Sequence, residues 1–393
     1  MKKINQYLIP VLLIPAFIIS CSKKGGNPNP PVNPPAKVFY TWDKFVMGAD
    51  ISYVNQVQDY GGTYKDSGTA KDPYDIFKIH GANTVRVRLW HDPQWLAALN
   101  SGKLYSDIKD VEKTIQRAKT AGMVVNLDLH YSDTWADPGT QQTPSAWSGL
   151  PLAVLKDSVY QYTLQVLNEL KSKNLVPEMI QVGNETNSGM LFPAGKVISN
   201  NWTNFGVLLN SGIKAVRDFS ATSSIKPQII LHVAQLQNAD YWADGVINKA
   251  GVTDFDILGI SHYYVYSTIA TMNDVGSTIS SLKSKYGKKI MIVETSYPWT
   301  SANADSYGNV ISGGTAFGSY TVSKDGQYQY LKDLTQQVIT GGGSGIMYWE
   351  PAWITSSLRD QWGTGSSWDN NTLFDFSGNT ITGIDYMTWE YKF

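Results

Sequence analysis

Two glutamates stand directly after apolar stretches that are typical of buried strands. Glu185 follows residues 179–184, and Glu294 follows the continuously apolar run 290–293. Two carboxyl groups that face each other can cleave a glycosidic bond, because one protonates the leaving oxygen while the other acts as nucleophile or base. A lone glutamate after an apolar stretch is weak evidence, since surface glutamates are common. The pair is informative only if the fold brings the two residues together.

Polar residues near other predicted strand ends suit the handling of a sugar. Asn184 can bond a sugar 2-hydroxyl, an interaction that strengthens in the transition state of glycoside hydrolysis. Arg86 or Arg88 can keep a nucleophilic carboxylate ionised and oriented, and alternate residues of a strand share a face, so both can point inward. A structural salt bridge is the competing role for the second arginine. The subsite of the cleaved sugar is expected to include His130, Tyr263 and Trp349.

A catalytic metal is not expected from the sequence. His130 lies near Asp128 and Asp133, but the chain has only five histidines and no His-x-His or His-Glu-x-x-His spacing. Cys21 is the single cysteine, which excludes a disulfide framework and a cysteine-based zinc site.

Eight short apolar stretches alternate with helix-like stretches, and these elements must position the polar residues. Strands are predicted over residues 46–52, 84–89, 124–131, 179–184, 228–233, 257–263, 289–295 and 345–349. Amphipathic stretches predict helices over residues 108–121, 153–173, 205–219, 279–286 and 328–339. Several strands are apolar on both faces, as in a buried parallel sheet.

This alternation predicts an α/β fold, a single (β/α)₈ barrel with long loops, over residues 38–393. Active-site residues of such barrels gather at the C-terminal ends of the strands. Glu185 and Glu294 would then end strands four and seven, on opposed sides of the barrel. A doubly wound open sheet is the alternative, but residues 48–52 lack the glycine-rich turn that usually follows its first strand.

Composition narrows the functional classes. The chain has 32 basic and 33 acidic residues, so it lacks the basic surplus of a nucleic-acid binder. The 13 Trp and 23 Tyr suit either a large core or stacking on the apolar faces of sugars. No second domain and no internal repeat is evident.

The N-terminus resembles a bacterial lipoprotein signal. Lys2 and Lys3 precede an apolar stretch at 8–19, and residues 18–20 before Cys21 resemble a lipobox. We predict a signal peptide over residues 1–20, a Pro-rich linker over 21–37 with lipid on Cys21, and a catalytic domain over 38–393. An ordinary secretory signal is the alternative.

A lipidated Cys21 predicts a cell-envelope lipoprotein at the outer membrane. Lys23 and Lys24 follow Cys21 where surface-exported lipoproteins of some bacteria carry acidic residues. Whether the enzyme faces the periplasm or the cell surface is therefore left open.

Six segments resemble glycoside hydrolase family 53, the endo-β-1,4-galactanases, and span nearly the whole chain after residue 38. They are GADIS at 48–52, VRVRLW at 85–90, HYSDTWADP at 130–138, QVGNE at 181–185, VETSYPW at 293–299 and YWEPAW at 348–353. The third and sixth segments are specific, whereas Asn-Glu alone is shared across a wider clan of barrels.

The resemblance implies a retaining mechanism on β-1,4-galactan, as in the arabinogalactan side chains of pectin. Glu185 would be the acid/base and Glu294 the nucleophile, with carboxyl groups about 5–5.5 Å apart. No catalytic cofactor is implied, and a monomer is expected. The implied substrate-binding residues are Asp50, Arg86, Arg88, Trp90, His130, Asp133, Trp135, Asn184, His262, Tyr263, Trp299, Trp349 and Trp353. For each tryptophan, packing in the core is the competing role.

The resemblance also implies a structural calcium site in the loop after the seventh strand. The expected ligands are Asn303, Asp305, the Tyr307 carbonyl and Asn309, and Asp369 can add another from the following loop. Calcium prefers six to eight oxygens with several carboxylates, and this loop supplies only one carboxylate. A plain polar loop is the alternative.

Two other functions stay open at this point. A related barrel enzyme could act on β-glucan or mannan, although the Trp-Ala-Asp-Pro segment at 135–138 argues against it. A non-catalytic glycan-binding lipoprotein is also conceivable, although the intact pair of glutamates argues against that.

Overall fold

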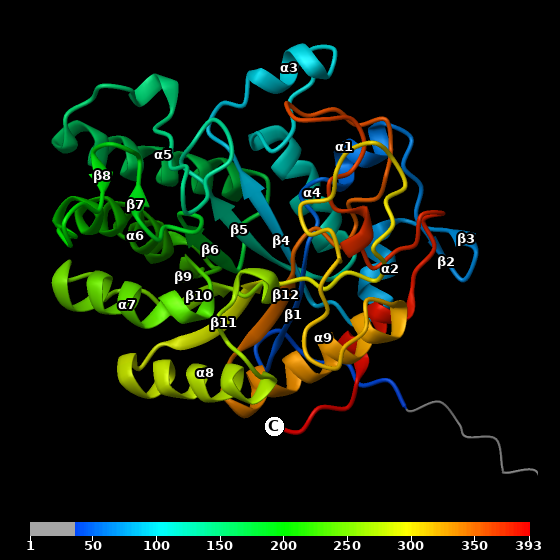
Figure 1. Ribbon diagram of the computed structural model, residues 1–393. Helices are drawn as coiled ribbons and strands as arrows, with labels where there is room; N and C mark the ends of the chain where they lie inside the picture. The colour runs from blue at the N-terminus through cyan, green and yellow to red at the C-terminus, as the bar shows by residue number, and fades with distance from the viewer. Residues whose placement is uncertain (1–35) are drawn as a thin grey trace, which may run out of the picture. The chain divides into compact units, whose positions relative to one another are not determined.

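Eight parallel strands close into a barrel in the computed structural model, which describes residues 36–393 (Figure 1). Neighbours around the barrel follow the chain, and β1 closes it by pairing with both the last strand and the second. The strands are β1 (Val46–Asp50), β4 (Thr84–Leu89), β5 (Val124–Leu129), β6 (Met179–Val182), β9 (Gln228–Ala234), β10 (Ile257–Ser261), β11 (Lys289–Glu294) and β12 (Gly345–Tyr348). The predicted (β/α)₈ barrel is confirmed. The predicted signal peptide and Cys21, with most of the predicted linker, lie outside the described residues.

Helices surround the strands, as Figure 1 shows. The longer ones, whose amphipathic pattern the sequence displays, are α4 (Ile108–Thr120), α5 (Leu152–Ser172), α6 (Thr203–Thr222), α8 (Met272–Tyr286) and α9 (Lys324–Thr340). Shorter ones are α1 (Val54–Asp59), α2 (Pro73–Ile79), α3 (Trp95–Leu99) and α7 (Ala239–Ala243), which continues into a π-helical turn at Asp244–Lys249. The short helices span too few residues for a periodic pattern to identify them. No helix among residues 36–393 has the length and apolarity needed to cross a membrane.

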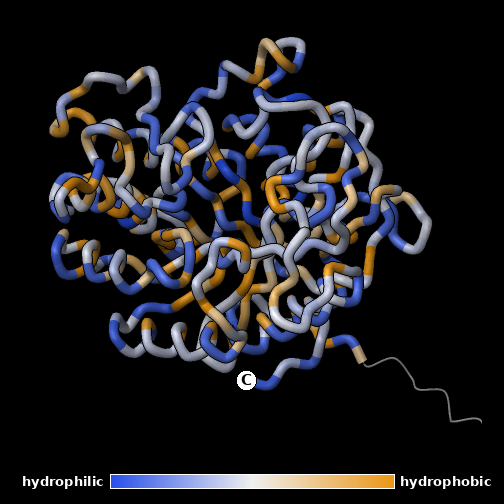
Figure 2. Tube along the Cα trace, in the orientation of Figure 1, coloured by the Kyte–Doolittle hydropathy of each residue, from blue (hydrophilic) through white to orange (hydrophobic). Residues whose placement is uncertain are grey.

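Local sequence explains where the helices begin and end. The Thr271 side chain caps α8 by accepting from the Asp274 backbone N–H, and the Asp274 carboxylate accepts from the Thr271 backbone N–H, which forms a capping box. Gly287 ends the same helix with φ +65°, a conformation that costs glycine little. Figure 2 shows apolar residues concentrated on the central strands, with hydrophilic residues along the surrounding helices.

The interior of the barrel changes from apolar to polar along the strands. Residues of six strands form a separate apolar cluster: Val46, Met179, Ile230, Ile257, Met291, Val293 and Met347. Two to four residues after Val46, Met179 and Ile230, the same strand faces become polar at Asp50, Gln181 and His232, which are buried. The neighbouring strands β4 and β5 add the buried polar residues Arg86 and Asp128. The polar end of the barrel is therefore the C-terminal end of its strands.

Asn83 fastens the segment before β1 to the barrel. Its amide nitrogen donates to the carbonyls of Tyr40 and Phe45 at 3.0 and 2.9 Å, and its oxygen accepts from the Met47 amide at 3.0 Å. Asn83 is 7 % exposed, so these three bonds are made in an environment largely without water.

We expect Asn83→Ala to lower the free energy of unfolding by about 2–4 kcal/mol, because it leaves three buried backbone groups without partners. Chemical denaturation of residues 38–393 measures this. Ser280→Ala, an exposed change on α8, should stay within about 0.5 kcal/mol of the parent. A loss equal to that of the control would show that Asn83 does not hold this segment.

Candidate active site

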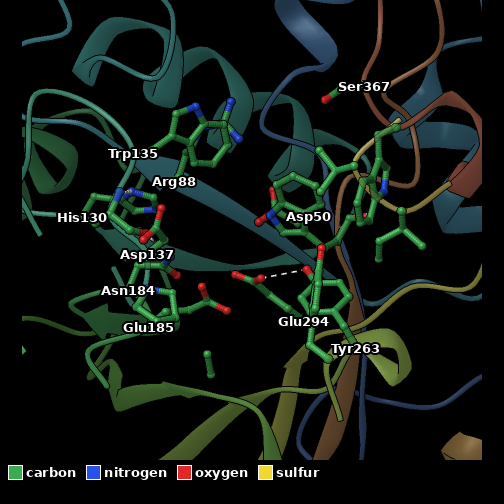
Figure 3. Close-up of a pocket in the computed structure, with 18 of the residues that line it drawn as sticks. Asp50, Arg88, His130, Trp135, Asp137, Asn184, Glu185, Tyr263, Glu294 and Ser367 are labelled. Carbon is green, nitrogen blue, oxygen red and sulfur yellow. Dashed lines mark hydrogen bonds between the residues drawn. The ribbon is translucent and has the colours of Figure 1, made fainter. Parts of the chain in front are cut away.

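A cleft of about 830 Å³ opens at the C-terminal ends of the strands. The cleft is lined by most of the residues predicted from the sequence to act in catalysis or substrate binding: Asp50, Arg86, Arg88, His130, Trp135, Asn184, Glu185, Tyr263, Glu294, Trp349 and Trp353. They come from seven strands and the loops that follow them. Figure 3 shows many of these side chains converging on one space.

Glu294 ends β11 and is held by two donors. Its Oε1 lies 2.7 Å from Arg86 Nη1, and its Oε2 accepts from the Tyr263 hydroxyl at 2.9 Å (Figure 3). Burial raises the pKa of the Glu294 carboxyl to about 7, and the ion pair with Arg86 and the bond from Tyr263 keep it below that of Glu185. Both donors favour the ionised carboxylate, which is the form that a nucleophile requires.

Arg86 is oriented by a cage of acceptors. Its guanidinium lies 2.6 Å from Asp50 and 2.8 Å from Asp128, and it donates to the side-chain oxygen of Asn184 at 2.8 Å. An arginine among carboxylates stays charged and keeps one geometry. Arg86 therefore presents a fixed positive charge to Glu294.

Glu185 lies opposite Glu294, and Figure 3 shows the two carboxyl groups pointing toward each other. The chain reaches Glu185 through a left-handed turn, with φ +84° at Gly183 and +45° at Glu185 itself. Burial and the negative charge of Glu294 together raise the pKa of Glu185 to about 8, against a hydrogen bond from Ser261 that lowers it. Glu185 is therefore the protonated member of the pair near neutral pH, and Glu294 is the ionised member.

Asn184 is fixed between the two halves of this arrangement. Its amide nitrogen donates to the Ala136 carbonyl at 2.8 Å, while its oxygen accepts from Arg86. Asn184 lines the cleft beside Glu185 and is 5 % exposed. Its side-chain amide is therefore placed to form a hydrogen bond with a hydroxyl of a sugar bound in the cleft.

One wall of the cleft is aromatic and is built around Arg88. The guanidinium lies 4.2 Å from the Tyr53 ring centre and 4.4 Å from that of Trp135, and it forms a 2.7 Å ion pair with buried Glu350. Tyr53 also stacks on Trp353 at 3.9 Å. Arg88 is thus the structural arginine of the pair, whereas Arg86 contacts the carboxylate of Glu294. Trp349 adjoins this wall and meets the edge of another cleft residue, Trp368, at 4.7 Å.

Four residues expected to bind substrate do not line this cleft. His262 is buried and lies next to Tyr263, which points into the cleft. Trp90 is 1 % exposed and packs with Leu96 and Tyr105, so it fills part of the core instead of contacting a sugar in the cleft. Trp299 packs on Phe376 with ring centres 4.7 Å apart. Asp133 bonds His91 at 3.1 Å and faces a neighbouring hollow.

Several residues that line the cleft were not predicted from the sequence: Tyr53, Gln235, Tyr266, Asp360, Trp362 and Trp368. Tyr53 directly follows the 48–52 segment, so extending that strand end by one residue would have included it. Trp362 and Trp368 belong to the long loop after β12, where no periodic pattern distinguishes surface positions from cleft positions.

The proposed calcium loop brings two carboxylates together. The Thr355 hydroxyl lies 2.8 Å from Asp305 and 2.9 Å from Asp369, and the Asn309 amide donates to Asp369 at 2.8 Å. The Tyr307 carbonyl accepts from Asn303 at 2.7 Å. Among the described residues, no group of three or more His, Cys, Asp or Glu side chains is placed to hold a metal ion.

Comparison with known proteins assigns the family. The model of glycosyl hydrolase family 53 matches residues 46–387. The chain is 43% identical over 353 residues to an arabinogalactan endo-beta-1,4-galactanase of Cellvibrio japonicus (strain Ueda107), which covers 88% of this chain and 92% of that protein. It is 35% identical to arabinogalactan endo-beta-1,4-galactanase A of Emericella nidulans, over 85% of this chain and 91% of that one.

Two solved structures agree with this assignment. The GH53 catalytic domain of Ignisphaera aggregans superposes with a TM-score of 0.80 at 32% identity, over 91% of this chain and all of that one. A fungal beta-1,4-galactanase structure superposes with a TM-score of 0.73 at 30% identity, over 87% and 98% of the two chains. With its two opposed glutamates at the ends of β6 and β11, this chain belongs to glycoside hydrolase family 53.

Proposed function

We propose that this glycoside hydrolase cleaves β-1,4-galactosidic bonds inside galactan and arabinogalactan chains, with retention of configuration. The observation that carries the proposal is the pair of opposed carboxyl groups of Glu185 and Glu294, of which Glu294 forms an ion pair with Arg86. The names of the relatives, arabinogalactan endo-beta-1,4-galactanase in the bacterial and fungal proteins, support the choice of substrate.

The first chemical step uses both glutamates. The Glu294 carboxylate attacks the anomeric carbon while Glu185 gives its proton to the leaving oxygen, which breaks the glycosidic bond and forms a galactosyl-enzyme ester. In the second step, Glu185, now a carboxylate, takes a proton from water, and that water releases the sugar from Glu294. Asn184, held by Arg86 and Ala136, is placed to bond the 2-hydroxyl.

The walls of the cleft suit a polysaccharide chain. Trp135, Trp349 and Trp353 line it on one side, and Tyr266, which is 53% exposed, lines it beyond Glu185. Aromatic faces pack against the apolar faces of sugar rings and leave the hydroxyls to polar partners. A cleft open to solvent, rather than a closed pocket, suits attack within a chain.

We also propose that Ca²⁺ binds between the loops after β11 and β12. Asp305 and Asp369 share one hydroxyl donor, and the side-chain oxygen of Asn309 is buried without a partner beside them. Turning the Asn309 amide by 180°, which exchanges its O and N positions, would add that oxygen to the two carboxylates and the Tyr307 carbonyl. Such a hard, oxygen-rich set suits calcium. The ion would join two loops and would take no part in the chemistry.

For the N-terminus we propose a lipid on Cys21 and a location in the cell envelope, with the Pro-rich tract as a spacer. The support is the sequence alone: a basic start, an apolar stretch and a lipobox-like run before the cysteine. A monomeric enzyme on such a tether could shorten polymers before import.

On potato galactan, the parent enzyme should release reducing sugar, with little release from cellulose or mannan. We expect Glu294→Ala to lower kcat by roughly 10⁴-fold or more, because the nucleophile is lost. Glu185→Ala should lose about 10²–10⁴-fold on galactan, because the sugar leaving group then has no acid. On a 2,4-dinitrophenyl β-galactobioside, whose leaving group needs no proton, azide should restore turnover of this variant by attacking the glycosyl-enzyme and should give a β-galactobiosyl azide. Exposed Glu390→Ala should equal the parent. Turnover of Glu294→Ala at the parent's rate would disprove the mechanism, and no release from galactan would disprove the substrate.

Calcium at a concentration 100-fold above its Kd should raise Tm by about 3–6 °C relative to EDTA, because the ion binds only the folded chain. Asp369→Asn should abolish this response, whereas Asp157→Asn, an exposed change on α5, should keep it. Differential scanning calorimetry checks the shift. An identical Tm in calcium and in EDTA would rule out the site.

In bacteria expressing the full chain, we expect labelled palmitate on the protein and partition into the detergent phase of Triton X-114. Cys21→Ala should abolish both. Protease treatment of intact cells then decides between the cell surface and the periplasm. A Cys21→Ala protein that partitions like the parent would contradict the anchor.

A further inference from the structure

A hydroxyl and an imidazole lie beneath Glu185 and have no part in the mechanism above. Ser261 Oγ lies 2.6 Å from Glu185 Oε1, and His232 Nε2 lies 2.9 Å from the same hydroxyl. Ser261 ends β10 and His232 lies in β9, and both side chains are fully buried. The three residues therefore form a fixed chain of hydrogen bonds that ends on one carboxyl oxygen of Glu185.

The directions of these bonds follow from the groups around His232. Its Nδ1 faces the backbone N–H of Glu185 at 3.2 Å, and that group can only donate. Nδ1 also faces Gln181 Nε2 at 3.0 Å, and the Gln181 amide is oriented because its oxygen accepts from Arg86. Nδ1 also lies 3.0 Å from the side-chain oxygen of Asn184, but that oxygen already accepts from Arg86 and Gln181. Because the Glu185 N–H can only donate, we assign the lone pair to Nδ1 and the hydrogen to Nε2.

His232 stays neutral in this position. Burial lowers its pKa well below the usual range, and the positive charge of Arg86 lowers it further. The Nε2–H thus donates to Ser261 Oγ, and the single hydroxyl hydrogen of Ser261 is directed to Glu185 Oε1. The opposite direction would leave that hydrogen buried without an acceptor.

We propose that Ser261, oriented by His232, is a positioning residue that keeps Glu185 Oε1 as an acceptor and places the transferable proton on Oε2. The inference rests on the proposed role of Glu185 as acid/base. A protonated carboxyl has one O–H, so the oxygen that accepts from Ser261 is not the one that carries the proton. After proton transfer, the same bond becomes charge-assisted and stabilises the carboxylate.

Ser261 therefore makes Glu185 a stronger acid than its surroundings would allow. The other groups that face Glu185 are Glu294 from β11, Arg86 from β4, Asp137 from the loop after β5, and Tyr263 and Tyr266 after β10. The bond from Ser261 lowers the pKa of Glu185, against burial and the charges of Glu294 and Asp137, which raise it. Removing the hydroxyl should move the titration upward.

The test is the pH profile of kcat/KM, whose alkaline limb reports the acid in the free enzyme. For Ser261→Ala we expect that limb to move up by about 1 pH unit. Hydrolysis of galactan should slow by about three- to tenfold near neutral pH, because the acid is weaker. A 2,4-dinitrophenyl β-galactobioside, whose leaving group needs no proton, should lose less than about twofold in bond cleavage.

Two variants separate positioning from folding. Ser296 lies two residues after Glu294, and its buried hydroxyl has no hydrogen-bond partner. Ser296→Ala removes that hydroxyl and should leave the alkaline limb of the pH profile in place. Ser261→Thr keeps a hydroxyl and should retain the parent's limb. The position of a limb does not depend on how much protein is folded, so partial unfolding cannot imitate the shift.

An alkaline limb that stays in place in Ser261→Ala, or one that moves equally in Ser296→Ala, would overturn the proposal. Failure of the proposed function looks different: Glu185→Ala would then not be rescued by azide. In that case the role of Glu185 would be wrong, whatever the behaviour of Ser261.

Discussion

One buried guanidinium organises the active end of this barrel. Arg86 meets Asp50, Asp128 and Glu294 at 2.6–2.8 Å, and three carboxylates around one cation leave an excess of negative charge in a buried space. Burying charges is costly unless they are paired and hydrogen-bonded, and here Asn184, Gln181 and Tyr263 supply the remaining bonds. Glu185 adds another carboxyl nearby, and the site accommodates it by keeping that group protonated. The division of labour between the glutamates follows from this balance of charge.

The barrel strands can be predicted from the sequence more completely than the residues that line the cleft. Strands such as β10 and β11 are apolar on both faces, so their bounds could be predicted from continuous apolar runs. The two glutamates could also be predicted, because strand ends of such barrels carry the active site. Both inferences use short-range patterns that the fold preserves.

Side-chain directions beyond the strand ends could not be predicted in this way. His262 and Tyr263 are adjacent and equally suited to sugar binding, and only the twist of the chain after β10 decides that Tyr263 enters the cleft. Trp90 and Trp135 are both tryptophans after strands, yet one fills a satellite core and the other lines the cleft. The loop after β12 depends on contacts between distant segments, such as Thr355 with Asp305 and Asp369. These outcomes are tertiary, and no local period encodes them.

The left-handed backbone at Glu185 has a consequence for how the enzyme can change. Left-handed φ values also occur at Tyr131, Gln235 and Glu350, each just beyond a barrel strand. Glycine or asparagine adopts this conformation at a lower free-energy cost than these residues. Each costs on the order of 1 kcal/mol that the rest of the fold must offset. At Glu185, a substitution by glycine would relieve the backbone strain, but it would also remove the carboxyl group. At this position, selection for thermal tolerance therefore has to act elsewhere, on caps, loops and the outer helices, while Glu185 keeps a conformation that its carboxyl group requires.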